Sequence, residues 1–99
     1  PTIPSYSSFN GYMYYIQVLK KKRLDLIKYL NKKSIMSVFH YIPLHDSFFG
    51  KKKGVAKFSM DNTNIISKNL LRLPIHYEFE KNKAQIVCKT IYNLFNCKP

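Results

Sequence analysis

The clearest periodic pattern in this 99-residue chain lies near its C-terminal end. Apolar side chains recur there at three- and four-residue intervals, at Ala84, Val87, Cys88, Ile91, Leu94 and Phe95. That spacing places them on one face of an α-helix, which Asn82 can cap at its N-terminus. A helix with a single apolar stripe has to bury that stripe, so the rest of the chain must provide a surface for it to pack on.

Other segments predict what that surface is. Residues 12–19, 34–41 and 71–75 are rich in apolar, β-branched or aromatic side chains and predict strands, the first so continuously apolar that we expect it to be covered on both faces. Residues 21–33 and 64–71 predict short helices. The order predicts an α+β fold, a small three-stranded, mainly antiparallel sheet with helices packed on one face.

The length allows one domain. We expect residues 1–8, which include two prolines, to be a lead-in or linker and residues 9–99 to be the folded domain. We also expect a piece of a longer protein, because the chain begins at Pro1 and not at a methionine. Neither a membrane-spanning run nor a secretory signal is present, so we expect a cytoplasmic location.

The net charge is +12, from 17 basic and 5 acidic residues. Such a charge is typical of proteins that bind nucleic acid or an anionic membrane. Only Arg23 and Arg72 are arginines, however, and base readers and phosphate clamps favour arginine. We therefore expect neither a nucleic-acid nor a membrane partner. A stand-alone basic module that binds RNA or another polyanion stays as the alternative, with Tyr12, Tyr14 and Tyr15 as stacking faces if their strand is exposed.

The stretch SVFHYIPLHDSFFGKKKG, residues 37–54, holds most of the reactive side chains. His40 and His45 would face opposite ways in an extended segment, and zinc needs three or four converging ligands, so we assign no metal ligands. The adjacent His45, Asp46 and Ser47 do not make a catalytic triad, and no G-x-S-x-G motif is present. Residues 44–62 predict a long loop, which is either an anion-attracting basic loop or a plain solvated one.

The two cysteines have no spacing typical of a zinc site or a disulfide framework. We expect Cys88 to be a small buried hydrophobic residue of the last helix and Cys97 to be a free thiol.

Three stretches together resemble one family: NGYMYYIQV (10–18), SVFHYIPLHDSFFG (37–50) and NIISKNLLRLPIHYEF (64–79). They are similar to the C-terminal part of the DegT/DnrJ/EryC1/StrS sugar-nucleotide aminotransferases. The closest branch aminates dTDP-4-keto-6-deoxyglucose at C4 for surface-polysaccharide synthesis. Its patterns F-H-Y-[IV]-P-L-H and L-L-R-L-P match Phe39–His45 and Leu70–Pro74. Where the branch has histidine, serine and proline, this chain has Tyr12, Asp46 and Phe48.

The resemblance implies the C-terminal small domain of a fold-type I aminotransferase that uses pyridoxal phosphate (PLP). Such an enzyme transfers an amino group from an amino acid to a nucleotide-linked keto-deoxy-sugar, and it works as a homodimer. In this family the Schiff-base lysine, the aspartate on the pyridine nitrogen and most phosphate contacts lie in a large N-terminal domain that these 99 residues lack. We therefore expect this chain to bind no cofactor alone, to be inactive alone, and to need the large domain as its partner.

The resemblance also suggests which residues reach the nucleotide-sugar substrate. His45, His40 and Tyr41 are the candidates, because residues 37–54 would lie near the boundary between the two domains. For His40, packing with one hydrogen bond is the alternative. Arg72 either contacts substrate or makes a buried ion pair or backbone-carbonyl contact. We take His76 as structural and assign no catalytic residue.

Overall fold

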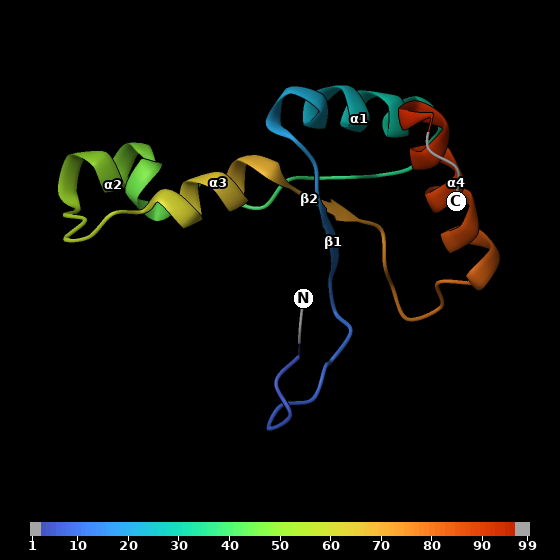
Figure 1. Ribbon diagram of the computed structural model, residues 1–99, viewed down its shortest axis with the longest axis horizontal. Coiled ribbons are helices and arrows are strands. Elements are labelled where there is room, and N and C mark those ends of the chain that lie inside the picture. Colours follow the sequence, from blue (N-terminus) through green and yellow to red (C-terminus); the bar gives the residue numbers. More distant parts are fainter. Residues whose placement is uncertain (1–2, 97–99) are drawn as a thin grey trace.

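The computed structural model describes residues 3–96 and shows an α+β arrangement, as predicted (Figure 1). Its elements, in chain order, are β1 (Tyr14–Gln17), α1 (Lys20–Lys32), the single 3-10 turn η1 (Leu44–Asp46), α2 (Phe48–Lys53), α3 (Asp61–Asn69), β2 (Leu70–Leu73) and α4 (Lys81–Phe95). α1 and α4 lie beside the sheet, whereas α2 and α3 extend away from it as an arm (Figure 1). None of the helices within residues 3–96 has the length and apolar character needed to cross a bilayer.

The sheet has two strands where three were predicted. β1 and β2 are antiparallel, with Tyr14 opposite Leu73 and Tyr15 opposite Arg72. The expected third strand contributes one bridge, in which Val38 and Arg72 exchange backbone hydrogen bonds of 3.2 and 2.8 Å. The ladder stops there because its next partner on one side is Pro74, which has no N–H to donate. On the other side the Leu70 carbonyl accepts from a guanidinium instead, at 3.3 Å.

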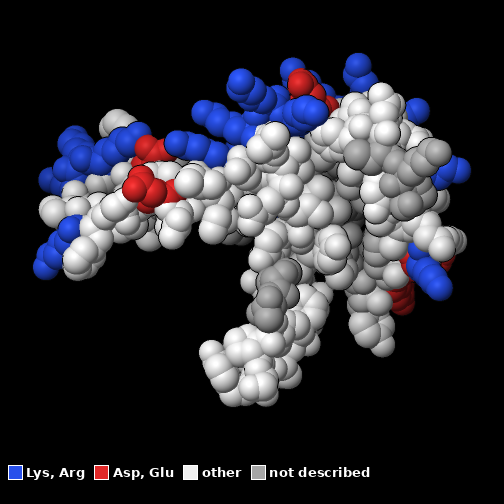
Figure 2. Space-filling view, in the orientation of Figure 1, with Lys and Arg blue, Asp and Glu red and all other residues white. Residues whose placement is uncertain are grey.

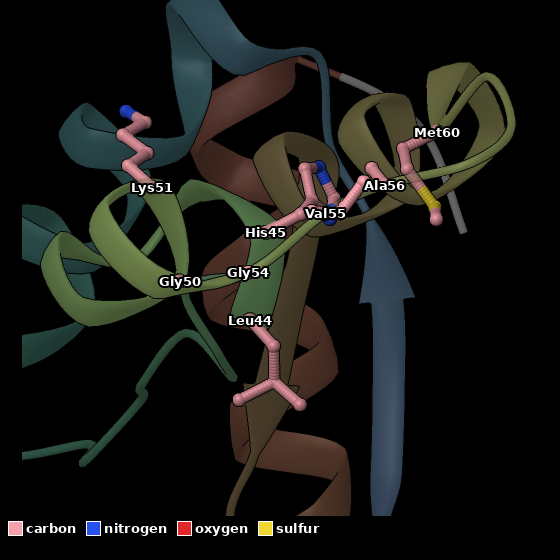
Figure 3. A pocket seen from close by; sticks show the side chains of 8 residues that line it. All are labelled: Leu44, His45, Gly50, Lys51, Gly54, Val55, Ala56 and Met60. Atoms are coloured by element: carbon pink, nitrogen blue, oxygen red, sulfur yellow. The ribbon is translucent and has the colours of Figure 1, made fainter.

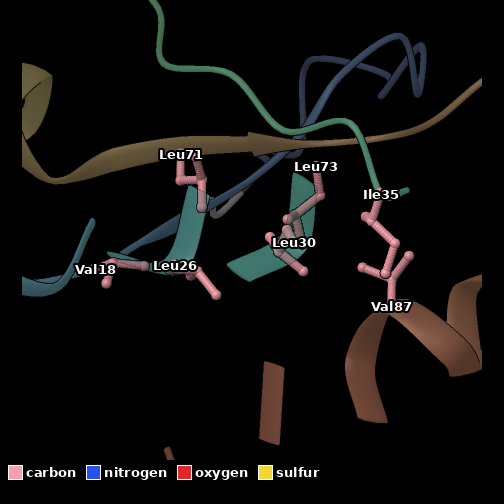
Figure 4. Packing of buried hydrophobic residues seen from close by; sticks show 7 residues of the cluster. All are labelled: Val18, Leu26, Leu30, Ile35, Leu71, Leu73 and Val87. Atoms are coloured by element: carbon pink, nitrogen blue, oxygen red, sulfur yellow. The ribbon is translucent and has the colours of Figure 1, made fainter. Parts of the chain in front are cut away.

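The core fills the space between β2 and the helices α1 and α4 (Figure 4). Leu26 and Leu30 of α1 and Leu71 of β2 are fully buried, because a 3.6-residue period on the helix and a two-residue period on the strand direct them to one place. Val87 of α4 packs into the same core, which confirms the apolar stripe predicted for that helix. The rest of the cluster is formed by Val18, Ile35 and Leu73.

The prediction that residues 12–19 are covered on both faces is wrong. Tyr14, which pairs with Leu73 on the core side, is 55% exposed, and Tyr15, which pairs with Arg72 on the other side, is half-buried. The other face of the sheet, where Tyr15 lies opposite Arg72, has no helix packed on it within the described residues. The continuous apolar character of residues 12–19 therefore does not mean that both faces of this strand are buried in this chain.

Residues 44–62 are more ordered than the predicted loop. The Ser47 hydroxyl caps α2 by accepting the Gly50 N–H at 2.9 Å. A Cβ at Gly50 would lie 1.7 Å from the Leu44 carbonyl oxygen, so only glycine allows α2 to fold back on η1.

Some boundaries and one burial also differ from prediction. α3 begins at Asp61 and ends at Asn69, two residues before the predicted end, because β2 starts directly after it. α4 begins at Lys81, one residue before the predicted cap Asn82. Cys88 is exposed, so its prediction as a buried residue is wrong: it lies on the edge of the apolar stripe and not at its centre, which Val87 occupies. Cys97 lies outside the described residues.

Candidate functional site

The candidate site is built on residues 35–45, which run in extended form past β2. Ile35 and Ser37 are only 8% and 4% exposed, whereas Met36 is 76% exposed. Alternation of this kind is what an extended backbone imposes, and it directs the even-numbered side chains away from the core. The bridge at Val38 fixes this face beside Arg72. His40 therefore lies on the open side of the sheet.

The first of three cavities lies between this segment and the end of β2, with a volume of about 510 Å³. His40 and Arg72 both line it, and His76 joins them from the turn after Pro74. The remaining walls are apolar: Met36, Val38, Leu73, Pro74 and Ile75. Two predicted site residues thus meet here, together with a histidine predicted to be structural.

A second cavity, of about 560 Å³, shares His40 with the first. It lies between residues 40–44 and α3, whose Asn62, Thr63 and Ser67 add polar groups. The rings of His40 and Tyr41 are in contact here, with centroids 4.3 Å apart and planes tilted by 39°. Tyr41 is 73% exposed, so its ring and hydroxyl are open to a ligand.

The third cavity, of about 340 Å³, shares Leu44 with the second and holds His45 (Figure 3). The Nε2 atom of His45 lies 2.9 Å from the Oδ1 of Asn64 on α3. Because that oxygen can only accept, Nε2 carries the proton and a neutral ring keeps Nδ1 as an acceptor. The other walls come from η1, α2 and the chain up to Met60. The three cavities form a row linked by His40 and Leu44.

Asp46, where the resembling branch has serine, holds this third cavity together from outside. Its carboxylate pairs with Lys51 of α2 at 2.5 Å. The hydrogen bond from Lys51, and then its charge, lower the pKa of Asp46 from its ordinary value. The pair ties η1 to α2 and leaves Asp46 out of the cavity lining.

The backbone-carbonyl contact that was one alternative for Arg72 is made instead by Arg23. Arg23 makes the backbone-carbonyl contacts, since its Nη1 donates to the Ser67 and Leu70 oxygens at 2.6 and 3.3 Å, and it lies 5.3 Å from the Phe39 ring centroid. Arg72 is half-buried and makes neither an ion pair nor a side-chain hydrogen bond with any residue from 3 to 96. Sequence reasoning missed Arg23, because nothing separates it from the run of lysines before it.

Solved structures share this fold, among them the aminotransferase TlmJ. TlmJ from Streptoalloteichus hindustanus matches 97% of this chain with a TM-score of 0.80 at 18% identity. DesV from S. venezuelae, solved with a ketimine intermediate, matches 88% with a TM-score of 0.73 at 19% identity. A proposed sugar aminotransferase from Streptococcus pneumoniae, in its PMP-form, matches 85% with a TM-score of 0.65 at 24% identity. The match covers only 22–25% of those chains, so this chain spans about a quarter of their length.

The family follows from the sequence match. A model of the DegT/DnrJ/EryC1/StrS aminotransferase family matches residues 2–92. The chain belongs to this family.

The described residues do not fit PLP as a cofactor site of their own. A lysine that forms a Schiff base is activated by a desolvated pocket or a neighbouring cation. Every lysine within residues 3–96 is exposed, and so is every carboxylate. No three metal-ligating side chains come together in that part of the chain either.

Proposed function

We propose that this chain is the C-terminal small domain of a PLP-dependent aminotransferase that transfers an amino group from an amino acid to a nucleotide-linked keto-deoxy-sugar. Residues 9–99 would form the domain and residues 1–8 its lead-in. The observation that carries the proposal is the row of cavities lined by His40, Tyr41 and His45, in a chain that belongs to the aminotransferase family. We further propose dTDP-4-keto-6-deoxyglucose as the substrate, because the matching motifs at Phe39–His45 and Leu70–Pro74 are those of that branch.

The proposal divides the labour between two parts of an enzyme. The remaining three quarters of the aminotransferase chain would hold the cofactor and its lysine, and this domain would close the other side of the cleft. Tyr12, Tyr14 and Tyr41 support such a partner, because they are large, exposed side chains that lie outside the core. Alone, the chain would bind no cofactor and catalyse no transfer.

Each site residue has a role that its surroundings suit. The Nδ1 of His45 can accept a hydrogen bond from a sugar hydroxyl, with the ring held by Asn64. Tyr41, whose ring contacts that of His40, offers an exposed ring face to the base of a nucleotide and a hydroxyl to its sugar. Arg72 would contact an acidic group at the far end of the row.

An NMR titration of the purified chain with dTDP tests the site. We expect saturable shifts of residues that line the second and third cavities, and a His45→Gln variant should bind several-fold more weakly because it loses the Nδ1 acceptor. Lys89→Gln on α4 is the control for charge, and it should bind as the unchanged chain does. In parallel, PLP added to the chain should not develop the yellow absorbance of a cofactor bound to a lysine. Shifts confined to the lysines of α1, or a yellow species that turns over an amino donor, would overturn the proposal.

One observation favours a second function, the binding of RNA or another polyanion. Lys and Arg side chains gather along the upper edge of the molecule, over α1 and α2 (Figure 2). Tyr12 and Tyr14 are 66% and 55% exposed, which supplies the open stacking faces that such a module needs. Tight binding of single-stranded RNA with a steep salt dependence would support this function, and weak binding with no preference among polyanions would count against it.

A further inference from the structure

We propose that the first cavity, between residues 36–40 and 72–76, binds the oxyanion of a small molecule, a carboxylate or a phosphate, through Arg72 with His40 and His76. The inference deepens the proposed function by naming what the Arg72 end of the row takes. It rests on that function only for the ligand's place in the reaction, since oxyanion binding is a property of this chain itself.

The backbone explains why these side chains converge. Val38 and Arg72 exchange hydrogen bonds at 3.2 and 2.8 Å, so the two extended segments lie side by side at this point. The two-residue period of an extended chain then puts His40 on the same face as Val38. Pro74 ends the pairing, and the chain beyond it leaves the sheet edge and brings His76 to the far wall of the cavity.

The ionisable side chains that line the cavity are all basic residue types. Its lining holds one arginine and two histidines, and it holds no carboxylate and no lysine. Arg72 is half-buried and has no hydrogen-bonded or ionic partner among residues 3–96. The Nδ1 of His40 is buried and likewise has no hydrogen-bond partner among them. Buried polar groups are normally paired, and a partly desolvated cation gains most from an anion.

The shape and walls of the cavity define the class of ligand. The guanidinium fork binds planar carboxylates and phosphates in pairs of hydrogen bonds, which a lysine cannot match. Apolar side chains of Val38, Leu73 and Ile75 line the cavity beside the charge, and a less polar surrounding strengthens its attraction for an anion. A volume of about 510 Å³ is within the range of small-molecule sites. It accommodates an anionic group together with a small organic body.

The test is an NMR titration of the whole chain with inorganic phosphate and, separately, with acetate, at constant ionic strength. We expect saturable shifts of the Arg72 Nε–H and of the His40 and His76 ring signals. Arg72→Gln should weaken binding at least tenfold, and Arg72→Lys should weaken it less, because the charge stays and the fork is lost. Lys28→Gln removes an equal charge from the exposed face of α1 and should change nothing. Tighter binding of phosphate would identify a phosphate ligand, and equal or tighter binding of acetate a carboxylate.

Shifts that never saturate, or an equal loss in Lys28→Gln and Arg72→Gln, would overturn the inference, because the chain would then only attract anions by its net charge. Arg72→Lys keeps the test decisive if Arg72→Gln fails to fold. The dTDP titration separates this inference from the proposed function. Oxyanion binding at Arg72 without dTDP binding at His45 would leave the inference standing and remove the support for a nucleotide-sugar enzyme. Binding of dTDP at His45 without oxyanion binding at Arg72 would overturn the inference and leave the proposed function standing.

Discussion

At the residue scale, single polar side chains decide how the site is held. Asn64 orients the His45 ring, Asp46 ties η1 to α2, and Ser47 caps that helix. Each of these side chains contacts either the backbone or a side chain that lines the third cavity. Two of them, Asp46 and Asn64, are separated by 18 positions, and only the folded arm brings their elements together.

Asp46 should titrate at a lower pH than an ordinary aspartate, because Lys51 bonds to and attracts its charged form. Its folded-state pKa is depressed, so the pair adds stability above the unfolded pKa of about 4, and that contribution disappears as the pH falls through the folded pKa. Carboxyl-carbon NMR across an acid titration measures this. In Lys51→Gln the pKa of Asp46 should rise toward its ordinary value. In the control Lys52→Gln the pKa of Asp46 should stay as low as in the unchanged chain. An unchanged pKa in Lys51→Gln would show that the ion pair does not form in solution.

At the scale of elements, the sequence predicts those with a strong period and misses those without one. The stripe of α4 and the leucines of α1 are evident because a core-facing helix repeats its apolar side chains. α2 shows no such period, since Phe48, Phe49, Gly50 and three lysines make up its six residues and none is buried. The one sequence signal for α2 was Ser47, a residue type that favours the N-cap of a helix. The third strand failed for a different reason: its bridge joins Val38 to Arg72, 34 residues further along the chain, and Pro74 then stops the ladder.

Gly50→Ala tests the fold of the arm. The added Cβ would meet the Leu44 carbonyl oxygen, so α2 must shift away from η1, and the third cavity must change shape. We expect a loss of about 1–3 kcal/mol, typical of overpacking, concentrated in α2. Amide hydrogen exchange should show faster exchange in α2 and little change in α4. Lys52→Ala in the same helix has no such clash and should exchange nearly as the unchanged chain does. Equal protection of α2 in both variants would contradict the close approach.

At the scale of the whole molecule, the core is small for the surface that it supports. The radius of gyration is 16.1 Å, against about 13 Å expected for a compact domain of 100 residues. The arm formed by α2 and α3 and the segment before β1 both project from the core (Figure 1). The resemblance read from the sequence identified the family correctly. The cavity lined by Arg72 and His76 could not be predicted without the fold. That cavity depends on the pairing of Val38 with Arg72, which no local sequence pattern predicts.

Leu26→Ala should destabilise the chain severely. Leu26 is fully buried between α1 and β2, and truncating such a leucine costs about 2–5 kcal/mol. A domain of this size has a total stability of about 5–15 kcal/mol, so a large fraction should be unfolded at moderate urea. Leu24→Ala on the same helix is the matched control, because Leu24 is 60% exposed and its loss should cost well under half as much. Urea denaturation followed by circular dichroism measures both. Equal midpoints would contradict the position of the core.

The guanidinium of Arg23 has a consequence beyond its own hydrogen bonds. It reaches from α1 to the Ser67 and Leu70 carbonyls, on either side of the junction where α3 becomes β2. That junction is where the arm joins the sheet, so the Arg23 side chain ties the base of the arm to α1. The walls of the second and third cavities belong partly to the arm and partly to the segment beside the core. We therefore expect a change at Arg23 to shift the walls of these two cavities, although Arg23 lines neither of them.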